Sequence, residues 1–268
     1  MRTALPGTTL WKYFPRKRFD SMLEDGALYF RRVMDFADDD PLEGTIPERD
    51  KAIDQAYVIS EHIQRPMAPD TLKARLDSAV SIEGWGTLES VIINCWTMCE
   101  EDTHHMWRLF AQDEKATKDE PAKYGVAIRT RIELLPIAFA NQPMEILGSA
   151  VRYIDHRTER FYAKDQYEHG TENVLVPIIH KHKAFEAERE FRLMHQFSGG
   201  FKAGELWDAY DSGRAKKITV NLPVLISEVM MSPHSTPHHK AEVEALCAAK
   251  GITADVRWSK LSPHWGRG

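Results

Sequence analysis

Residues 90–98, SVIINCWTM, form the most apolar strand-like run of the chain. β-Branched and aromatic residues dominate it, and both types pack well on a pleated surface. A nearly continuous apolar run indicates a strand that is buried on both faces, whereas a half-exposed strand would alternate with polar residues. We therefore expect this stretch at the centre of a sheet.

Around this stretch, strand-like segments outnumber helical ones, and the helices do not alternate regularly with the strands. TLWKYF at 9–14 and ALYFRRV at 27–33 are typical of strands, and EEDTHHMWRLFAQDE at 100–114 is typical of an amphipathic helix. This order predicts an α+β fold with a mixed, largely antiparallel central sheet and inserted helices. Because no linker rich in Gly, Ser or Pro divides it, we expect residues 1–268 to form a single domain, with a mainly helical insertion at about 47–81.

The composition excludes several classes of protein. A formal net charge of −5 and a pI of about 6.2 provide no general attraction to nucleic acid or to anionic membranes. No apolar run has the length of a signal peptide core or of a membrane span. Three cysteines are few and odd in number, which favours a reduced protein, so we predict a cytoplasmic location and no membrane partner.

Common cofactor and nucleophile motifs are also missing. The chain lacks G-x-G-x-x-G, G-x-x-x-x-G-K-[ST] and G-x-S-x-G, so dinucleotide folds of the Rossmann type, P-loops and hydrolase elbows lack support. The acidic run DFADDDPLEG at 35–44 is compatible with a divalent cation, but it lacks the spacing of a calcium loop. We favour a solvated turn for this run and predict no metal site.

The stretch HKHKAFEAEREFRLMH at 180–195 is the strongest candidate for a site. On a strand, Glu188, Glu190 and Arg192 share one face, and the two carboxylates lie about 7 Å apart. Such carboxylates repel each other unless a cation, a hydroxyl pair or an arginine stands between them, so the arrangement is a poor choice for stability alone. The first half, KAFEAERE, is also compatible with the start of a helix. We favour the strand and name these three residues as catalytic candidates.

The N-terminal region combines basic and aromatic side chains on its two predicted strands. Lys12 and Tyr13 lie on the first strand, and Tyr29 and Arg31 lie on the second. Arginine and aromatic rings at alternating positions are suited to a ligand that contains phosphate and a base. A rim of solvated arginines around core aromatics explains the pattern equally well.

Taken in order, these segments resemble the bacterial domain of unknown function 2971 family. The resemblance covers nearly the whole chain through short motifs, and its late landmark is an aromatic residue followed by Glu-x-Glu-x-Arg. One departure is Asp39, which stands where the family usually has Asn. The matching residues are Lys12, Tyr13, Asp40, Pro41, Glu43, Asn94, Cys95, Trp96, Met106, Trp107, Gly125, Ile128, Phe185, Glu188, Glu190 and Arg192.

By analogy, the plan of this family is similar to that of ADP-ribosyltransferase folds, which implies NAD as a substrate. The resemblance implies that Tyr13 and Tyr29 flank the nicotinamide and that Lys12 or Arg31 holds the pyrophosphate. Trp96 is placed with these residues as a further cofactor-binding candidate. The implied reaction is transfer of ADP-ribose to an unidentified protein or nucleic-acid acceptor, or hydrolysis of NAD, in phage defence or a stress response.

The three catalytic candidates receive distinct roles under the same analogy. Glu190 is expected to hydrogen-bond a ribose hydroxyl and to stabilise the oxocarbenium-like state as nicotinamide leaves. Glu188 is expected to orient the acceptor or water, and Arg192 to keep both carboxylates ionised.

Two other classes of function stay open at this point. The first is a module that acts on or senses nucleic acid, in which the carboxylates hold a metal and basic side chains contact phosphates. The second is a non-catalytic partner protein, in which the Glu/Arg face is a structural ion-pair ladder. The residues expected to contact phosphates in the first are Lys12, Arg16, Arg18, Arg31, Lys181 and Lys183.

Overall fold

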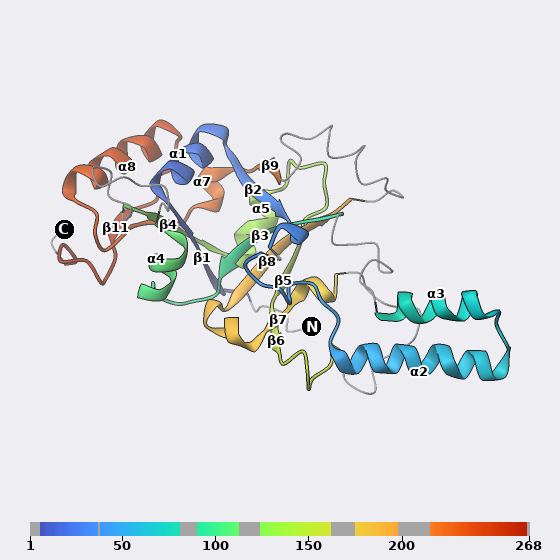
Figure 1. Cartoon of the computed structure of the whole chain (residues 1–268). Coiled ribbons are helices and arrows are strands. Elements are labelled where there is room, and N and C mark those ends of the chain that lie inside the picture. The colour runs from blue at the N-terminus through green and yellow to red at the C-terminus, as the bar shows by residue number, and fades with distance from the viewer. Residues whose placement is uncertain are drawn as a thin grey trace.

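The computed structural model describes residues 6–36, 38–80, 90–112, 124–161, 175–197 and 215–266. Its helices and its mixed, mostly antiparallel sheet confirm the predicted α+β class (Figure 1). Within these ranges the main sheet contains nine strands, and it includes both the first and the last strand of the chain. These strands are β1 (Thr9–Phe14), β2 (Ala27–Arg32), β3 (Val91–Thr97), β4 (Val126–Arg131), β5 (Leu147–Ala150), β8 (Glu190–Gln196), β9 (Ala215–Thr219), β10 (Glu228–Met231) and β11 (Val256–Trp258).

Strand β3 is central, as the apolar run at 90–98 predicts. One edge of β3 pairs with β8 along its whole length, from Val91 to Thr97. Its other edge is shared by two strands, because β1 pairs with it at Thr97 and β2 pairs with it at Ile92 and Ile93. The sheet therefore forks at β3, between β1 and β2.

Two polar side chains occupy the fork. Lys12 of β1 donates from Nζ to the carbonyl oxygen of Cys95 at 2.8 Å, and Asn94 donates from Nδ2 to the carbonyl oxygen of Tyr29 at 2.8 Å. Since a buried backbone carbonyl without a partner is costly, these bonds replace the ladder bonds that diverging strands cannot make. The Lys12 ammonium group also lies over the ring of Trp96 at 5.8 Å.

Helices cover both faces of the main sheet. The larger core cluster contains side chains of α1, α5, α7 and α8, and these helices lie together on one face (Figure 1). Helix α4 covers part of the other face, where Met106 and Trp107 pack on Trp11 and Tyr13 of β1. The bounds of these helices are α1 (Arg16–Asp25), α4 (His104–Phe110), α5 (Leu135–Ala138), α7 (Leu222–Leu225) and α8 (Pro237–Ala249).

Local sequence explains where several elements begin and end. Helix α1 stops at Gly26, whose φ of 61° is the left-handed conformation that glycine adopts without strain. Helix α8 begins at Pro237 behind a Thr236 cap, as its sequence predicts. Gly125 lies between Ala111, which follows α4, and Phe14, which ends β1: a Cβ there would lie 2.4 Å from the Cβ of Ala111 and 2.8 Å from the carbonyl oxygen of Phe14.

The segment predicted as a helical insertion contains two antiparallel helices, α2 (Glu48–Gln64) and α3 (Pro69–Val80). This hairpin stands away from the sheet in Figure 1. Its root is fixed by Asp50, which is buried and accepts hydrogen bonds from Arg160 Nε and Phe161 N at 2.8 Å each. Residue 81, the last of the predicted insertion, lies outside the described residues.

Other expectations need correction. The helix predicted at 100–114 is shorter, because α4 ends at Phe110, and residues 113 and 114 are not described. Within the described ranges, the apolar run before His180 contains a short 3-10 helix, η4 (Pro177–Ile179). Two short strands, β6 (Arg152–Ile154) and β7 (His180–His182), form a separate parallel pair. No helix in the described part of the chain is both long and apolar enough to cross a membrane.

Candidate functional site

The stretch 180–195 divides into three elements, so each of the two interpretations holds for a part of it. Strand β7 ends at His182, a 3-10 helix η5 (Lys183–Glu188) follows, and β8 begins at Glu190. The prediction that Glu188 lies on the strand is wrong, because Glu188 ends the helix. The strand assignment of Glu190 and Arg192 is confirmed.

The change of direction between Glu188 and Glu190 takes place at Arg189. Its φ of 45° and ψ of 51° are left-handed, and in the described ranges no other residue except glycine has a positive φ. This conformation is unfavourable for a side chain with a Cβ, and such strain is frequently found at functional sites. Its consequence is geometric: both neighbouring carboxylates reach one cation, with Lys181 Nζ at 2.8 Å from Glu188 Oε2 and 3.5 Å from Glu190 Oε2.

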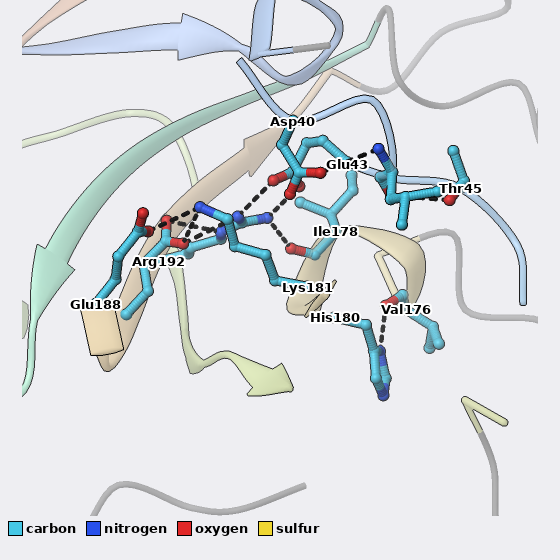
Figure 2. A network of polar contacts seen from close by, with 11 residues as sticks. Asp40, Glu43, Thr45, Val176, Ile178, His180, Lys181, Glu188 and Arg192 are labelled. Carbon is cyan, nitrogen blue, oxygen red and sulfur yellow. Dashed lines mark hydrogen bonds and ion pairs between the residues drawn. The ribbon is translucent and has the colours of Figure 1, made fainter. Parts of the chain in front are cut away.

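Arg192 is the centre of the network drawn in Figure 2. Its Nε donates to Glu190 Oε1 at 2.9 Å, and its Nη2 donates to Glu190 Oε2 at 3.0 Å and to Glu43 Oε2 at 2.8 Å. Its Nη1 donates to Glu43 Oε1 at 2.6 Å and to the carbonyl oxygen of Ile178. A guanidinium group has five N–H donors, and all five are used here. Arg192 therefore has no donor left for a ligand.

The acidic run at 35–44 is not a solvated turn at two of its positions. Glu43 and Asp40 are 5% and 4% exposed, and the carboxylate of Glu43 forms the paired hydrogen bonds with Arg192 described above. The expectation of a solvated turn is wrong for these residues, because Glu43 compensates a buried guanidinium group. The contact between Glu43 and Arg192 therefore joins this turn to β8, although the two residues are 149 positions apart in the sequence.

The two carboxylates next to Arg189 differ in their pKa. Burial raises the pKa of Glu188 above its ordinary value, and this effect outweighs the attraction of Lys181. Burial acts in the same direction on Glu190, but the charge and hydrogen bonds of Arg192 outweigh it and lower the pKa of Glu190 to about 2. Glu190 thus stays ionised, whereas Glu188 titrates closer to neutrality.

The Arg192 network comprises Glu43, Lys181, Glu188, Glu190 and Arg192. Its three carboxylates and two cations leave one formal negative charge. The side chains of Glu43 and Arg192 are 1% exposed, whereas that of Glu188 is 14% exposed. Within the described residues, Glu188 Oε1 accepts no hydrogen bond, and Glu188 is the most exposed carboxylate of this network.

The other predicted site residues lie on two faces of the sheet. Side chains alternate along strands, and the register places Tyr13, Tyr29 and Arg31 on the same face as Glu190. Tyr29 is 55% exposed on this face, whereas Tyr13 is buried edge-on against Trp107, with ring centroids 4.9 Å apart. Stacking of Tyr13 on a nicotinamide is therefore not compatible with this arrangement.

The side chains of Lys12 and Trp96 project from the opposite face of the sheet. Lys12 is partly buried in the fork, where burial lowers its pKa to about 8 despite nearby negative charge, and Trp96 is buried in the larger core cluster. A single ligand that contacts Glu188 cannot also stack on Trp96 without passing through the sheet.

Most of the basic residues that the nucleic-acid alternative requires are already paired. Arg16 contacts Asp20 and Glu242, Lys181 contacts Glu188 and Glu190, and Lys183 contacts Glu159. Arg31 pairs with Asp39, and Lys12 is held by the fork. In the described ranges, no group of three or more His, Cys, Asp or Glu is arranged to hold a metal ion.

Sequence reasoning did not place Glu43 in a site, and it named Lys181 only as a phosphate contact in the nucleic-acid alternative. Glu43 lies in the short motif Asp40-Pro41-x-Glu43 that carries the resemblance, so this motif was a usable signal for it. The signal for Lys181 was its position seven residues before Glu188, but a strand interpretation did not bring the two together.

A buried histidine beside the network predicts acid lability. His180 donates from Nδ1 to the carbonyl oxygen of Val176 at 2.7 Å, and its Nε2 is buried without a partner in the described structure. Burial lowers the pKa of His180 to about 4, and Arg152 and His156 act in the same direction. The unfolded chain therefore binds a proton first as the pH falls below about 6.5, and the folded state loses stability between that pH and 4.

We expect His180 to account for a loss of about 2 kcal/mol in the free energy of unfolding between pH 7 and pH 5. Urea unfolding of wild type and His180→Leu at both pH values measures this, because the variant has no imidazole to titrate. The matched control is His238→Gln, on an 80% exposed side chain. An equal pH dependence in wild type and His180→Leu would contradict the assignment.

No protein-family model matches the chain, and searches of curated proteins and of solved structures return no significant match. The resemblance to the domain of unknown function 2971 family therefore rests on the motifs above and stays a prediction.

Proposed function

We propose that the chain cleaves the N-glycosidic bond of NAD, either by hydrolysis or by transfer of ADP-ribose to an acceptor. One observation supports this proposal above the others: Glu188 and Glu190 share the ammonium group of Lys181, while their pKa values are displaced in opposite directions. When the environments of two neighbouring carboxylates displace their pKa values in opposite directions, one can accept a proton as a base while the other stays negatively charged. Cleavage of a glycosidic bond through an oxocarbenium-like state uses both a base and a fixed negative charge.

The bonds that break and form at ribose C1′ determine the role of Glu188. The bond between ribose C1′ and the nicotinamide nitrogen breaks, and its electron pair leaves with nicotinamide. Water or an acceptor hydroxyl adds to C1′, and its proton passes to Glu188, the carboxylate that is open to a ligand. A base with a raised pKa is better suited to accept this proton near neutral pH.

Glu190 and Arg192 are positioning residues in this proposal. Both oxygens of Glu190 already accept hydrogen bonds from Arg192, so Glu190 contributes a fixed negative field and does not grip a ribose hydroxyl. An ionised group that is already held in place stabilises positive charge that develops near it in the transition state, because the group does not have to move during the reaction. Arg192 holds Glu190 ionised and ties it to the turn at Glu43.

The ligand's other contacts are assigned to β2. Tyr29 is exposed on the face that carries Glu190, which suits stacking on a nicotinamide ring. Arg31 on the same face lies 4.6 Å from the ring centroid of Phe36, and its side chain is 38% exposed. We assign the pyrophosphate to Arg31, whose exposed ion pair with Asp39 would be exchanged for two hydrogen bonds from its guanidinium group to phosphate oxygens.

Chromatography of pure protein incubated with NAD tests the proposal through its products. We expect nicotinamide and ADP-ribose in equal amounts if water is the acceptor, and nicotinamide with ADP-ribosylated protein or nucleic acid if it is not. Reduced NAD is the matched control, because its dihydronicotinamide is a poor leaving group. NAD that is left intact in the presence of water and of candidate acceptors would contradict the proposal.

A further inference from the structure

Helix α2 presents an apolar stripe to solvent. Ala52, Ala56, Ile59 and Ile63 follow each other at intervals of four, three and four residues, and all four are exposed. Ile63 is 76% exposed and Ile59 is 48% exposed, although isoleucine is among the residues most often found inside proteins. The spacing is that of the a and d positions in a helix that packs along another helix.

The opposite side of α2 already has its partner. Val58 is buried there, and Glu61 pairs with Arg75 of α3 at 2.6 Å. The root of the hairpin is held by Asp50, and the rest stands away from the sheet (Figure 1). Within the described residues, the hairpin therefore buries one side of α2 and leaves the stripe uncovered.

We propose that the stripe pairs with the stripe of a second copy of this chain, with the two α2 helices antiparallel. A twofold axis between Tyr57 and Val58 places Ala52 opposite Ile63 of the other copy, and Ala56 opposite Ile59. Each large side chain then meets a small one at all four levels, so the surface is complementary to itself. Contacts between identical patches are the usual form of a twofold interface.

The charges around the stripe are also compatible with a second copy of the chain. Between Ala52 and Ile63 the residues that flank the stripe are uncharged, apart from a histidine, so two copies do not bring like charges together there. Residues 48–80 contain six acidic and five basic side chains, a balance that neither repels a second copy nor attracts a polyanion. The flanking residues are Ile53, Gln55, Ser60 and His62.

Sedimentation equilibrium of the full chain tests the pairing and its direction. We expect a dimer at micromolar concentration, and we expect Ile63→Glu to weaken association by about 100-fold or more, because a carboxylate without a partner would be buried in the contact. Circular dichroism should be unchanged, since Ile63 is exposed in the monomer. Ile137→Glu, at a 59% exposed position of α5, is the matched control and should remain dimeric.

The double variant Ala52→Lys with Ile63→Glu tests the register. Antiparallel pairing places the two new charges opposite each other in both symmetric contacts, so we expect the dimer to return. A monomeric wild type would overturn the proposal, as would a dimer that survives Ile63→Glu. Failure of the double variant to restore a dimer lost in the single variant would overturn the antiparallel pairing.

Discussion

Replacing Arg192 by methionine is expected to lower the free energy of unfolding by about 3–5 kcal/mol, because the buried carboxylate of Glu43 loses its compensating charge and Glu190 keeps only that of Lys181. Glu43 and Glu190 are each about 5% exposed, and every N–H of Arg192 is directed at them or at the carbonyl oxygen of Ile178. Methionine has a similar length, so the effect reports the lost charge and hydrogen bonds more than a cavity. Urea denaturation at pH 7 measures the change.

The matched control for this substitution is Arg257→Met. Arg257 pairs with Asp255 at 2.9 Å on the surface, where both side chains are more than 60% exposed. Exposed ion pairs contribute about 0–1 kcal/mol, so the control should be close to wild type. Equal stabilities of the Arg192 and Arg257 variants would show that the buried network does not hold β8 to the turn at Glu43.

Replacing Glu188 by glutamine is expected to reduce the rate of nicotinamide release by about 100-fold to 10,000-fold, the range for loss of a general base. Stability should change little, because burial already disfavours the charged form of Glu188 and glutamine carries no charge. The measurement is the initial rate of nicotinamide release at saturating NAD.

Glu186→Gln serves as the control for that experiment. Glu186 lies in the same 3-10 helix, two residues earlier, and is exposed. We expect its rate of nicotinamide release to equal that of wild type. A Glu188→Gln variant that is as active as Glu186→Gln would remove Glu188 from the reaction and leave the network a purely structural role.

Local patterns predicted the elements of this fold better than they predicted its site. The apolar run at 90–98 identified the central strand, because burial on both faces leaves a signal within the run itself. The fork between β1 and β2 left no such signal in the sequence. Both strands pair with the same edge of β3, and which of them pairs at a given residue depends on how the two strands diverge. Lys12 therefore appeared as a phosphate ligand, although its ammonium group bonds to the carbonyl oxygen of Cys95.

The candidate site was harder to predict for two physical reasons. Contact between Glu43 and Arg192 joins residues 149 positions apart, and spacing rules carry no information over that distance. The left-handed conformation of Arg189 is also not suggested by its residue type, and it removes Glu188 from the strand. Of the three groups expected between the two carboxylates, a cation, a hydroxyl pair or an arginine, the structure places a cation there, Lys181.

In the proposed mechanism, Glu190 is locked in its ionised form while Glu188 is open to a ligand. Carbon NMR of protein labelled at the glutamate carboxyl carbons, titrated from pH 8 to pH 4 with and without NAD, tests it most directly. We expect Glu190 to stay ionised throughout and Glu188 to titrate above its ordinary value of 4.5, with NAD shifting the Glu188 signal. Titration of Glu190 within this range, or a Glu188 signal that does not respond to NAD, would contradict the claim.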